Sequence, residues 1–220
     1  HKNNPGLCSS CSRIVSNKTS NGGFIHTDYR IICNICNSKT INSDIELEES
    51  RKRVLNILRN QGFNNLPDNV PIKLVSRTQL QKLKGGDPNI RGLTDYTYSY
   101  LKNSFEEIVN ETKDYTIYIL DKLTKIDFES VLAHEYLHVW LLNNDQEYNS
   151  SITEGFCNLG AFLIYNLKND KYSEIQLEKM NKDPDPNYGV GYRNMKQCLD
   201  QKGWEVLIKE VKDGNAKLCY

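Results

Sequence analysis

The chain has 220 residues and no formal net charge, because 28 lysines and arginines balance 28 acidic residues. This balance gives no support to a general nucleic-acid-binding protein, which needs a basic surface, or to attraction to an anionic membrane surface. No apolar run approaches the roughly 20 residues that a bilayer-spanning helix needs, so we expect neither nucleic acid nor a membrane as a partner.

Two close pairs of cysteines lie near the start of the chain, Cys8 with Cys11 and Cys33 with Cys36. Two C-x-x-C pairs suit a tetrahedral zinc site with four thiolates, which is closed and structural. The segment between the pairs, residues 22–32, alternates well enough to predict a hairpin. We therefore expect a small zinc module whose metal holds together a segment too short to bury a core of its own.

The remaining cysteines and one histidine add little chemistry to this module. His26 is an alternative ligand, but four thiolates already complete the shell, which favours an exposed histidine on the hairpin. Cys157, Cys198 and Cys219 have no paired spacing and are interpreted as reduced, partly buried thiols. Because the seven cysteines are an odd number and the first residues lack a hydrophobic signal segment, we expect a reducing, cytoplasmic location.

The middle of the chain reads as a succession of helices, strands and loops. Residues 45–61 are rich in helix formers and end at Gly62, and this helix is expected to connect the zinc module (residues 1–44) to the main domain (residues 45–220). Downstream, the sequence predicts a strand, a short helix, a loop and a second strand, at residues 70–75, 77–83, 85–94 and 115–120.

A metal-binding motif follows, the string HEYLH that begins at His134 and ends at His138. It lies in residues 126–142, which carry apolar residues at helical spacing, with Asp127 as the N-cap or a first-turn acid. Residues four apart share a helix face, so both imidazoles can bind one metal ion. Glu135 points off that axis, where it can act as general base for a zinc-activated water.

A second predicted helix, residues 150–166, supplies the third ligand. Glu154 lies one turn into it, and two imidazoles with one carboxylate and an open fourth position form a catalytic rather than a structural zinc site. Asn158 sits one turn further along the same face, where its amide oxygen can accept the Nδ1–H of His134 and fix its tautomer. The alternative is that both histidines are ordinary surface or core residues and that Glu154 is only an N-terminal helix acid.

The C-terminal part of the chain predicts further helices separated by a turn. After residues 171–180 come the turn 183–186 and a Gly-flanked segment with Tyr188, Tyr192 and Arg193, and two more helical stretches close the chain. These three side chains are candidates for stabilising the oxyanion of a tetrahedral intermediate. Simple packing at the start of a helix explains them at least as well.

The strand expected at residues 115–120 carries a hypothesis about the substrate. An extended peptide can add to the free edge of a strand by backbone pairing, and in zinc peptidases such a strand often borders the cleft. An ordinary core strand is an equally good interpretation, because an edge position cannot be read from one sequence.

Two other functions are compatible with parts of this pattern. The first is a non-catalytic, zinc-stabilised protein-interaction module, against which the intact Glu135 counts, because a binding scaffold has no evident need for that acid. The second is a DNA-linked protease with a zinc ribbon, against which the neutral charge counts. The preferred interpretation is a zinc-dependent endopeptidase that acts on protein or peptide substrates.

A likeness to a known family extends over nearly the whole chain. Six segments carry it, namely Cys8 to Cys36, Ile72 to Arg77, Arg91 to Leu93, Leu132 to Trp140, Glu154 to Cys157, and Tyr188 to Arg193. In these segments the chain resembles the LIM-domain-linked zinc peptidases. That family is typified by ubiquitin-activated plant regulators of organ size (the DA-one type) and includes bacterial relatives.

This resemblance implies a gluzincin-type metallopeptidase in which His134, His138 and Glu154 bind zinc and Glu135 is the base. The four cysteines would hold a second, structural Zn²⁺ in half of a LIM-like module. A ubiquitin-related partner is implied by the resemblance only, because the chain has one such module and no visible ubiquitin-interacting helices. The expected fold is α+β, with a hairpin-based four-cysteine module followed by a mainly helical zincin-type metallopeptidase domain that contains a small sheet.

Overall fold

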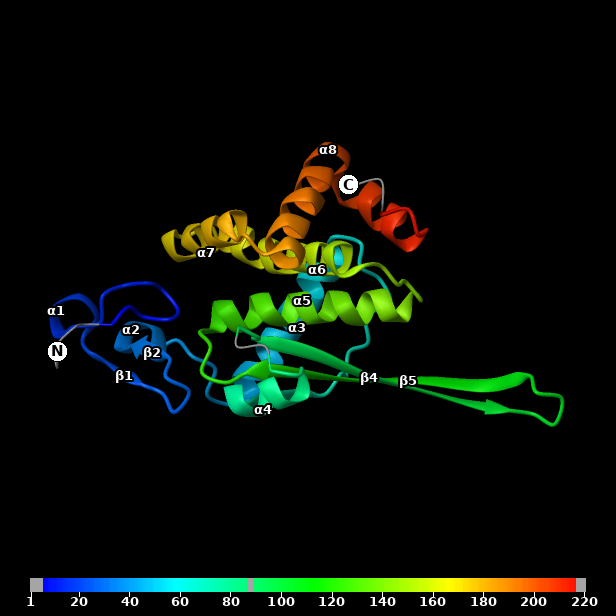
Figure 1. The fold of residues 1–220 in the computed structure, drawn as a ribbon, viewed down its shortest axis with the longest axis horizontal. Helices are drawn as coiled ribbons and strands as arrows, with labels where there is room; N and C mark the ends of the chain where they lie inside the picture. Colours follow the sequence, from blue (N-terminus) through cyan, green and yellow to red (C-terminus); the bar gives the residue numbers. More distant parts are fainter. Residues whose placement is uncertain (1–5, 87–88, 217–220) are drawn as a thin grey trace.

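The cysteine-rich N-terminal segment forms a small hairpin-based unit in the computed structural model, which describes residues 6–86 and 89–216. β1 (Gly23–Ile25) pairs antiparallel with β2 (Ile31–Cys33), so the predicted hairpin is confirmed. The unit has a small core of its own and lies at one end of the molecule (Figure 1). Two one-turn helices accompany the hairpin, α1 (Asn17–Ser20) and α2 (Asn34–Asn37).

The rest of the chain combines helices with a three-stranded sheet, which confirms the α+β class. Gly203 has non-helical geometry and kinks the last helix, in agreement with the two helical stretches expected there. The division into two domains at residue 44 stays a prediction. The elements in chain order are α3 (Asp44–Asn60), β3 (Ile72–Val75), α4 (Arg77–Leu83), β4 (Gly92–Lys102), β5 (Ile108–Leu120), α5 (Lys125–Asn143), α6 (Ser150–Lys168), α7 (Lys171–Lys182), the π-helix η1 (Pro186–Val190) and α8 (Gly191–Lys212).

The sheet has the strand order β3-β5-β4, with β3 parallel and β4 antiparallel to β5. β5 is therefore the central strand, and the hypothesis that residues 115–120 offer a free edge to a substrate is wrong. β4 is an outer strand, and its first residues line the cleft described below. The edge that could receive an extended peptide thus belongs to β4.

Four helices lie in layers on one face of the sheet (Figure 1). α5 packs directly on β4 and β5, α6 packs on α5, and α7 and α8 pack on α6. This arrangement buries α5 on nearly all sides, which explains why its apolar residues do not keep to one face. Within the part of the chain that the structure describes, no helix combines the length and apolar character needed to cross a bilayer.

Helices α5 and α6, which carry the predicted metal ligands, each begin at a residue whose side chain caps the helix. The Thr124 hydroxyl accepts the N–H of Asp127 at the start of α5, and the Asn149 side chain accepts the N–H of Ile152 at the start of α6. Both helices agree with their predicted ranges within two residues at either end. Asp127 is the expected first-turn acid, whereas the cap of α5 is Thr124.

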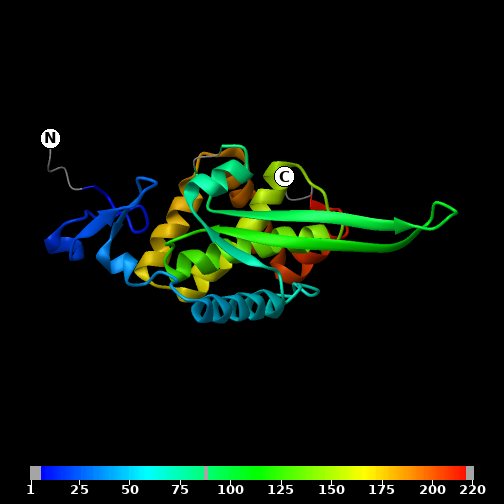
Figure 2. The same ribbon diagram turned by 90° about the horizontal axis from the view of Figure 1, so that it is seen from below.

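The distal parts of β4 and β5 extend beyond the rest of the molecule as a two-stranded ribbon (Figures 1 and 2). Residues 95–102 of β4 and 108–112 of β5 are all exposed. We call residues 95–114 the arm. The sequence predicted a strand only from residue 115 onward, so the arm is a feature that sequence reasoning missed.

Candidate metal centres and cleft

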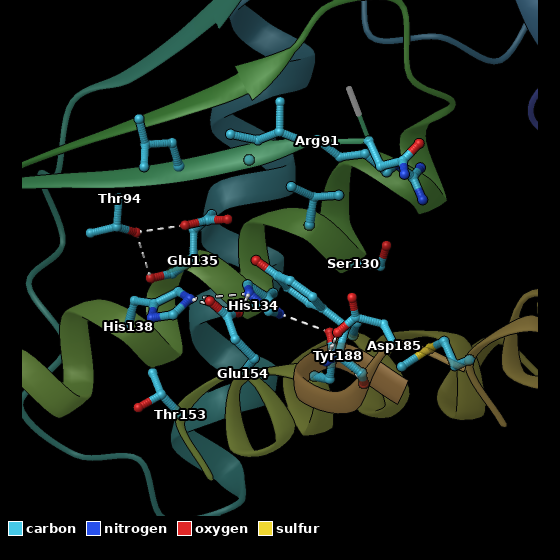
Figure 3. Close-up of a pocket in the computed structure, with 18 of the residues that line it drawn as sticks. Arg91, Thr94, Ser130, His134, Glu135, His138, Thr153, Glu154, Asp185 and Tyr188 are labelled. Atoms are coloured by element: carbon cyan, nitrogen blue, oxygen red, sulfur yellow. Dashed lines mark hydrogen bonds and ion pairs between the residues drawn. The ribbon is translucent and has the colours of Figure 1, made fainter. Parts of the chain in front are cut away.

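Two histidines and one carboxylate converge between α5 and α6. His134 and His138 lie one turn apart on α5, with their Nε2 atoms 3.1 Å from each other. Glu154 brings Oε2 to 3.2 Å from Nε2 of His134 and to 3.5 Å from Nε2 of His138. The structure thus brings the predicted ligand set together at one point (Figure 3).

The position of Glu154 depends on close packing between α6 and the start of α8. A Cβ on Gly155 would lie 3.0 Å from the Cα of Gly191 and still closer to the Gly191 carbonyl group, so only glycine fits there. Because Gly155 follows Glu154 directly, this contact fixes the position of the Glu154 carboxylate relative to α8. It also brings η1, which precedes Gly191, beside His134 (Figure 3).

The donor set fits a divalent metal ion. Nδ1 of His134 lies 2.9 Å from the Oδ1 of Asn158, as predicted, so Nδ1–H donates to the amide and Nε2 keeps its lone pair. The Oε2 of Glu154 is buried and has no hydrogen-bond partner among the described residues. Nitrogen and oxygen donors that converge in this way are the ligands of zinc sites with an open position.

The electrostatics of this group favour positive charge. Burial opposes ionisation of Glu154, yet the adjacent imidazoles of His134 and His138 hold the pKa of its carboxyl well below the usual range. Burial likewise opposes a charged His134, but Glu154 and Glu135 raise the pKa of its imidazole. The pocket therefore stabilises a cation, whether a proton or a metal ion.

The outer strand β4 holds Glu135 beside His134, His138 and Glu154, which we call the ligand group. The Thr94 hydroxyl donates to Oε2 of Glu135 at 2.8 Å, and Figure 3 shows the two side chains facing each other. Gly92 lies opposite the same carboxyl group, because a Cβ there would be 2.9 Å from Cδ of Glu135. Glu135 is buried, and Thr94 is a partner that sequence reasoning missed.

Tyr188 reaches the histidines from η1. Its ring stacks on that of His134 at a centroid distance of 6.3 Å, and its hydroxyl accepts a hydrogen bond from Nζ of Lys84 at 3.0 Å. The Asp185 side chain accepts the N–H of Tyr188, and the Asn158 side chain donates to the Tyr188 carbonyl. Burial raises the pKa of Tyr188 to about 12, so the phenol stays protonated at neutral pH.

Tyr192 and Arg193, the other two candidates for oxyanion stabilisation, face away from the cleft. Tyr192 is buried in the core, with its ring beside Phe162. Arg193 donates to the carbonyls of Asn181 and Asp183 and so holds the turn before η1. Neither side chain lines the cleft, so packing is the role of both, and the catalytic prediction for Tyr192 is corrected.

A cleft of about 820 Å³ opens beside the ligand group and is lined by the start of β4. The N–H of Leu120 donates to the carbonyl of Arg91. In an antiparallel pair every second residue bonds to the partner strand, so from Arg91 onward the odd-numbered residues of β4 bond to β5 and the even-numbered ones do not. The backbone groups of Gly92 and Thr94 consequently point to the free edge of β4. Lys84 and Arg91 line the same cleft, and no motif in the sequence marks them as site residues.

The four predicted thiolates of the N-terminal unit also converge. Their sulfur atoms lie within 4.8 Å of one another, and all four cysteines are free of disulfides. A hydrogen bond from Cys36 lowers the pKa of Cys8 to about 4, whereas the same bond raises the pKa of Cys36. This group could hold a metal ion, and His26 is not part of it, as expected. The four candidate ligands are Cys8, Cys11, Cys33 and Cys36.

The remaining cysteines differ from one another. Cys157 is a free thiol, as expected, and it is fully rather than partly buried. Cys198 forms a disulfide bond, so its predicted reduced state is wrong, and Cys219 lies outside the described residues. Because disulfides persist mainly in oxidising compartments, this bond does not support the cytoplasmic location, which stays a prediction.

The buried carboxylate of Asp127 joins the cysteine-rich unit to α5. Asp127 accepts hydrogen bonds from the hydroxyls of Ser10 at 2.9 Å, of Tyr165 at 2.7 Å and of Tyr172. Arg91, which lines the cleft, lies 3.5 Å from the same carboxylate. Burial opposes ionisation, but Arg91 and the three hydroxyls lower the pKa of Asp127. The unit is thus fixed to the first turn of α5.

No protein-family model, curated protein or solved structure matches the chain. The resemblance to LIM-linked peptidases therefore stays an expectation. The described residues supply two groups that could hold a metal ion, one with nitrogen and oxygen donors and one with sulfur donors. The chemistry of these groups is the basis for assigning a function.

Proposed function

We propose that this chain is a zinc-dependent peptidase that cleaves peptide bonds within protein substrates. The observation that carries the proposal is the convergence of His134, His138 and Glu154 beside a buried Glu135. A structural metal site is closed, whereas this ligand group lines an open cleft of about 820 Å³. The expected relation to the gluzincin class and to LIM-linked peptidases belongs to this proposal.

His134, His138 and Glu154 would hold the catalytic zinc, and the four cysteines of the N-terminal unit would hold a structural one. Zinc with three protein ligands supplies Lewis acidity, which polarises a carbonyl group and makes water acidic near neutral pH. The hydrogen bond to Asn158 orients the imidazole of His134 for this role. The ligand side chains are 12 to 20% exposed, so the site is shielded on most sides and open only toward the cleft.

Glu135 acts as the general base. Thr94 donates to its Oε2, and no hydrogen bond to Oε1 is seen among the described residues, so Oε1 would accept the proton from the attacking water. The same carboxyl group then gives this proton to the leaving amine. Thr94 and the close contact with Gly92 hold the carboxyl group in one orientation during both transfers.

Tyr188 stabilises the oxyanion of the tetrahedral intermediate. Lys84 donates to the phenol oxygen, so the phenol O–H acts as a donor and would donate its hydrogen bond to the substrate carbonyl oxygen. The raised pKa of about 12 keeps that proton on Tyr188 at neutral pH. Asn158 positions both His134 and Tyr188, since its amide oxygen accepts from the His134 ring and its amide nitrogen donates to the Tyr188 carbonyl.

An extended segment of the substrate pairs with the outer edge of β4. The backbone groups of Gly92 and Thr94 face that edge, and an added strand would run past Glu135 and the ligand group. This mode of binding suits unfolded or partly folded proteins, which offer extended segments. The proposal therefore assigns to β4 the role that the sequence had suggested for residues 115–120.

The test is cleavage of casein by the zinc-loaded protein and by its Glu135→Gln variant. The amide keeps the size of the side chain but takes no proton, so we expect cleavage to fall by at least about 100-fold. Zinc content and melting temperature should stay the same, because the ligands are unchanged. Glu178→Gln is the matched control, since Glu178 is an exposed glutamate in a surface ion pair on α7.

Two outcomes would contradict the proposal. Cleavage by Glu135→Gln at the wild-type rate would remove Glu135 as the base. A wild-type protein that binds zinc at both sites and cleaves no protein would favour a zinc-stabilised interaction module instead.

A further inference from the structure

One face of the arm carries a row of tyrosines. Tyr96, Tyr98 and Tyr100 alternate along β4 and are 42%, 38% and 51% exposed. Thr94 belongs to the same alternating series and points to Glu135 on α5. Because alternate residues of a strand share a face, the tyrosine row lies on the side of the sheet that carries the candidate catalytic residues. The row therefore continues the floor of the cleft outward.

The backbone edge of β4 is also continuous from the cleft into the arm. Pairing with β5 uses the backbone groups of the odd-numbered residues and leaves those of the even-numbered residues, from 92 to 100, facing outward. In the described ranges, β5 is the only strand that pairs with β4. The seven residues from Thr94 to Tyr100 span about 20 Å of extended chain. A strand that begins at the ligand group can thus continue along the arm.

The arm is attached firmly at its root, beside the end of α5. Tyr96 stacks on Tyr115 with ring centroids 6.0 Å apart, and the Tyr115 hydroxyl donates to Asn143 at 2.8 Å. Lys113 donates to the carbonyl of Leu142 at 3.0 Å. These contacts fix the direction in which β4 and β5 extend from the rest of the molecule as a ribbon (Figure 2).

The arm carries more negative than positive charge. Glu111 accepts a hydrogen bond from the Tyr98 hydroxyl, so part of this charge lies at the tyrosine row. Carboxylates beside exposed aromatic faces attract lysine and arginine side chains, through Coulomb attraction and cation–π contacts. The same charge would be repelled by an anionic lipid surface. The charged side chains of the arm are Asp95, Glu106, Glu107, Glu111 and Asp114 against Lys102 and Lys113. Asp95 and Asp114 lie on the face opposite the tyrosine row, and Nζ of Lys102 lies 5.9 Å above the Tyr100 ring.

We propose that the arm docks an extended, lysine- or arginine-containing segment of the protein substrate. The segment pairs with the free backbone edge of β4, and its side chains contact the tyrosine row. It lies about six residues to one side of the bond that is cleaved, since Thr94 faces Glu135 and Tyr100 is six residues further along the edge. The identity of the ligand as a substrate rests on the proposed function, whereas binding itself does not need the catalytic residues.

Binding is tested with fluorescein-labelled peptides of about 16 residues, long enough to cover the edge. One peptide alternates lysine with valine, and its matched control alternates glutamate with valine. The full chain carries Glu135→Gln, so that no peptide is cleaved. We expect fluorescence anisotropy to show binding of the lysine peptide alone, and added salt should weaken it.

Variants of the arm then locate the binding surface. The double variant Tyr98→Thr/Tyr100→Thr keeps good strand formers and is expected to bind the lysine peptide at least about tenfold more weakly. Thr97→Ala, on the opposite face of the same strand, should bind as before. Circular dichroism and melting temperature establish that each variant is folded.

A proline at position 98 separates backbone pairing from side-chain contact. The N–H of Tyr98 faces the free edge, so Tyr98→Pro keeps the hydrogen bonds to β5 and removes one outward donor. It should bind the lysine peptide more weakly than Tyr98→Thr. Equal binding by the two folded variants would overturn the backbone pairing.

Other outcomes would overturn the whole proposal. These are unchanged binding by the double variant, or equal binding of the two peptides. Arm-dependent dimerisation in light scattering would assign the surface to a second copy of the chain, and arm-dependent binding to phosphatidylcholine vesicles would assign it to a membrane. Because the assay uses an inactive variant, failure of the wild-type protein to cleave casein would refute the peptidase and leave this result standing.

Discussion

Replacing Gly92 by alanine tests whether the position of Glu135 controls the reaction. A Cβ at residue 92 would lie 2.9 Å from Cδ of Glu135 and closer still to its Oε1, whereas ordinary contacts begin at 3.4 Å, so the carboxyl group must move by more than about 0.5 Å. Since a displacement of about 1 Å can cost about 100-fold in rate, we expect kcat to fall roughly tenfold or more. The new methyl group would also lie 2.7 Å from Val131, and such crowding costs about 1–3 kcal/mol of unfolding free energy.

The assay for Gly92→Ala is steady-state cleavage of casein well below the melting temperature, together with zinc analysis. The zinc ligands lie outside this contact, so both metal equivalents should remain bound. A lower kcat with full zinc content is therefore the expected result. A folded variant with the wild-type kcat would refute the account of how β4 holds Glu135.

Three further substitutions probe the surroundings of the site. Asn158→Ala removes the acceptor for His134 and is expected to weaken zinc binding by about 10- to 100-fold in competition with a chelator; unchanged affinity would exclude this role. Tyr188→Phe should lower kcat by about 100-fold at constant zinc content, and an unaltered kcat would exclude it as the oxyanion donor. Asp127→Asn should lower the free energy of unfolding, measured by urea denaturation at neutral pH, by about 3 kcal/mol. This value is at the low end for breaking a buried ion pair, because the Arg91 side chain is 39% exposed. The pKa of Asp127 is lowered by folding, so its contribution exists above the unfolded-state pKa of about 3.9 and fades as the pH falls below it. The two proteins should therefore converge in stability toward low pH, and a constant gap would contradict this reasoning.

The helices that carry the ligand group could be predicted because their signals are local. Helical spacing of apolar residues gave α5 and α6 within two residues, and the four-residue step put His134 and His138 on one face. One-turn spacing also gave the contact between Asn158 and His134. The C-x-x-C pairs gave the convergence of the four cysteines in the same way.

The features that were missed depend on contacts between distant residues. Lys84 meets Tyr188 across 104 positions, and Thr94 meets Glu135 across 41, so no local pattern marks either pair. The arm did carry a local signal in the alternation of Tyr96, Tyr98 and Tyr100. That β4 is the outer strand, however, is set by the order of the whole sheet, which periodicity does not contain.

The correction at Tyr192 has a geometric cause. Four-residue spacing from Tyr188 would put both side chains on one face of a regular α-helix. Tyr188 lies in the π-helix η1, however, and Tyr192 lies in the α-helix that follows. The wider π turn changes the angle between successive residues, so Tyr188 faces the cleft while Tyr192 turns into the core.

The central claim is that a zinc ion is bound by two imidazoles and a carboxylate beside Glu135. Anomalous diffraction at the zinc edge, from crystals of the zinc-supplemented protein, tests it most directly. The account predicts two peaks, one between His134, His138 and Glu154 and one among the four cysteines. A single peak at the cysteines, with no metal at the histidines after zinc is supplied, would contradict it.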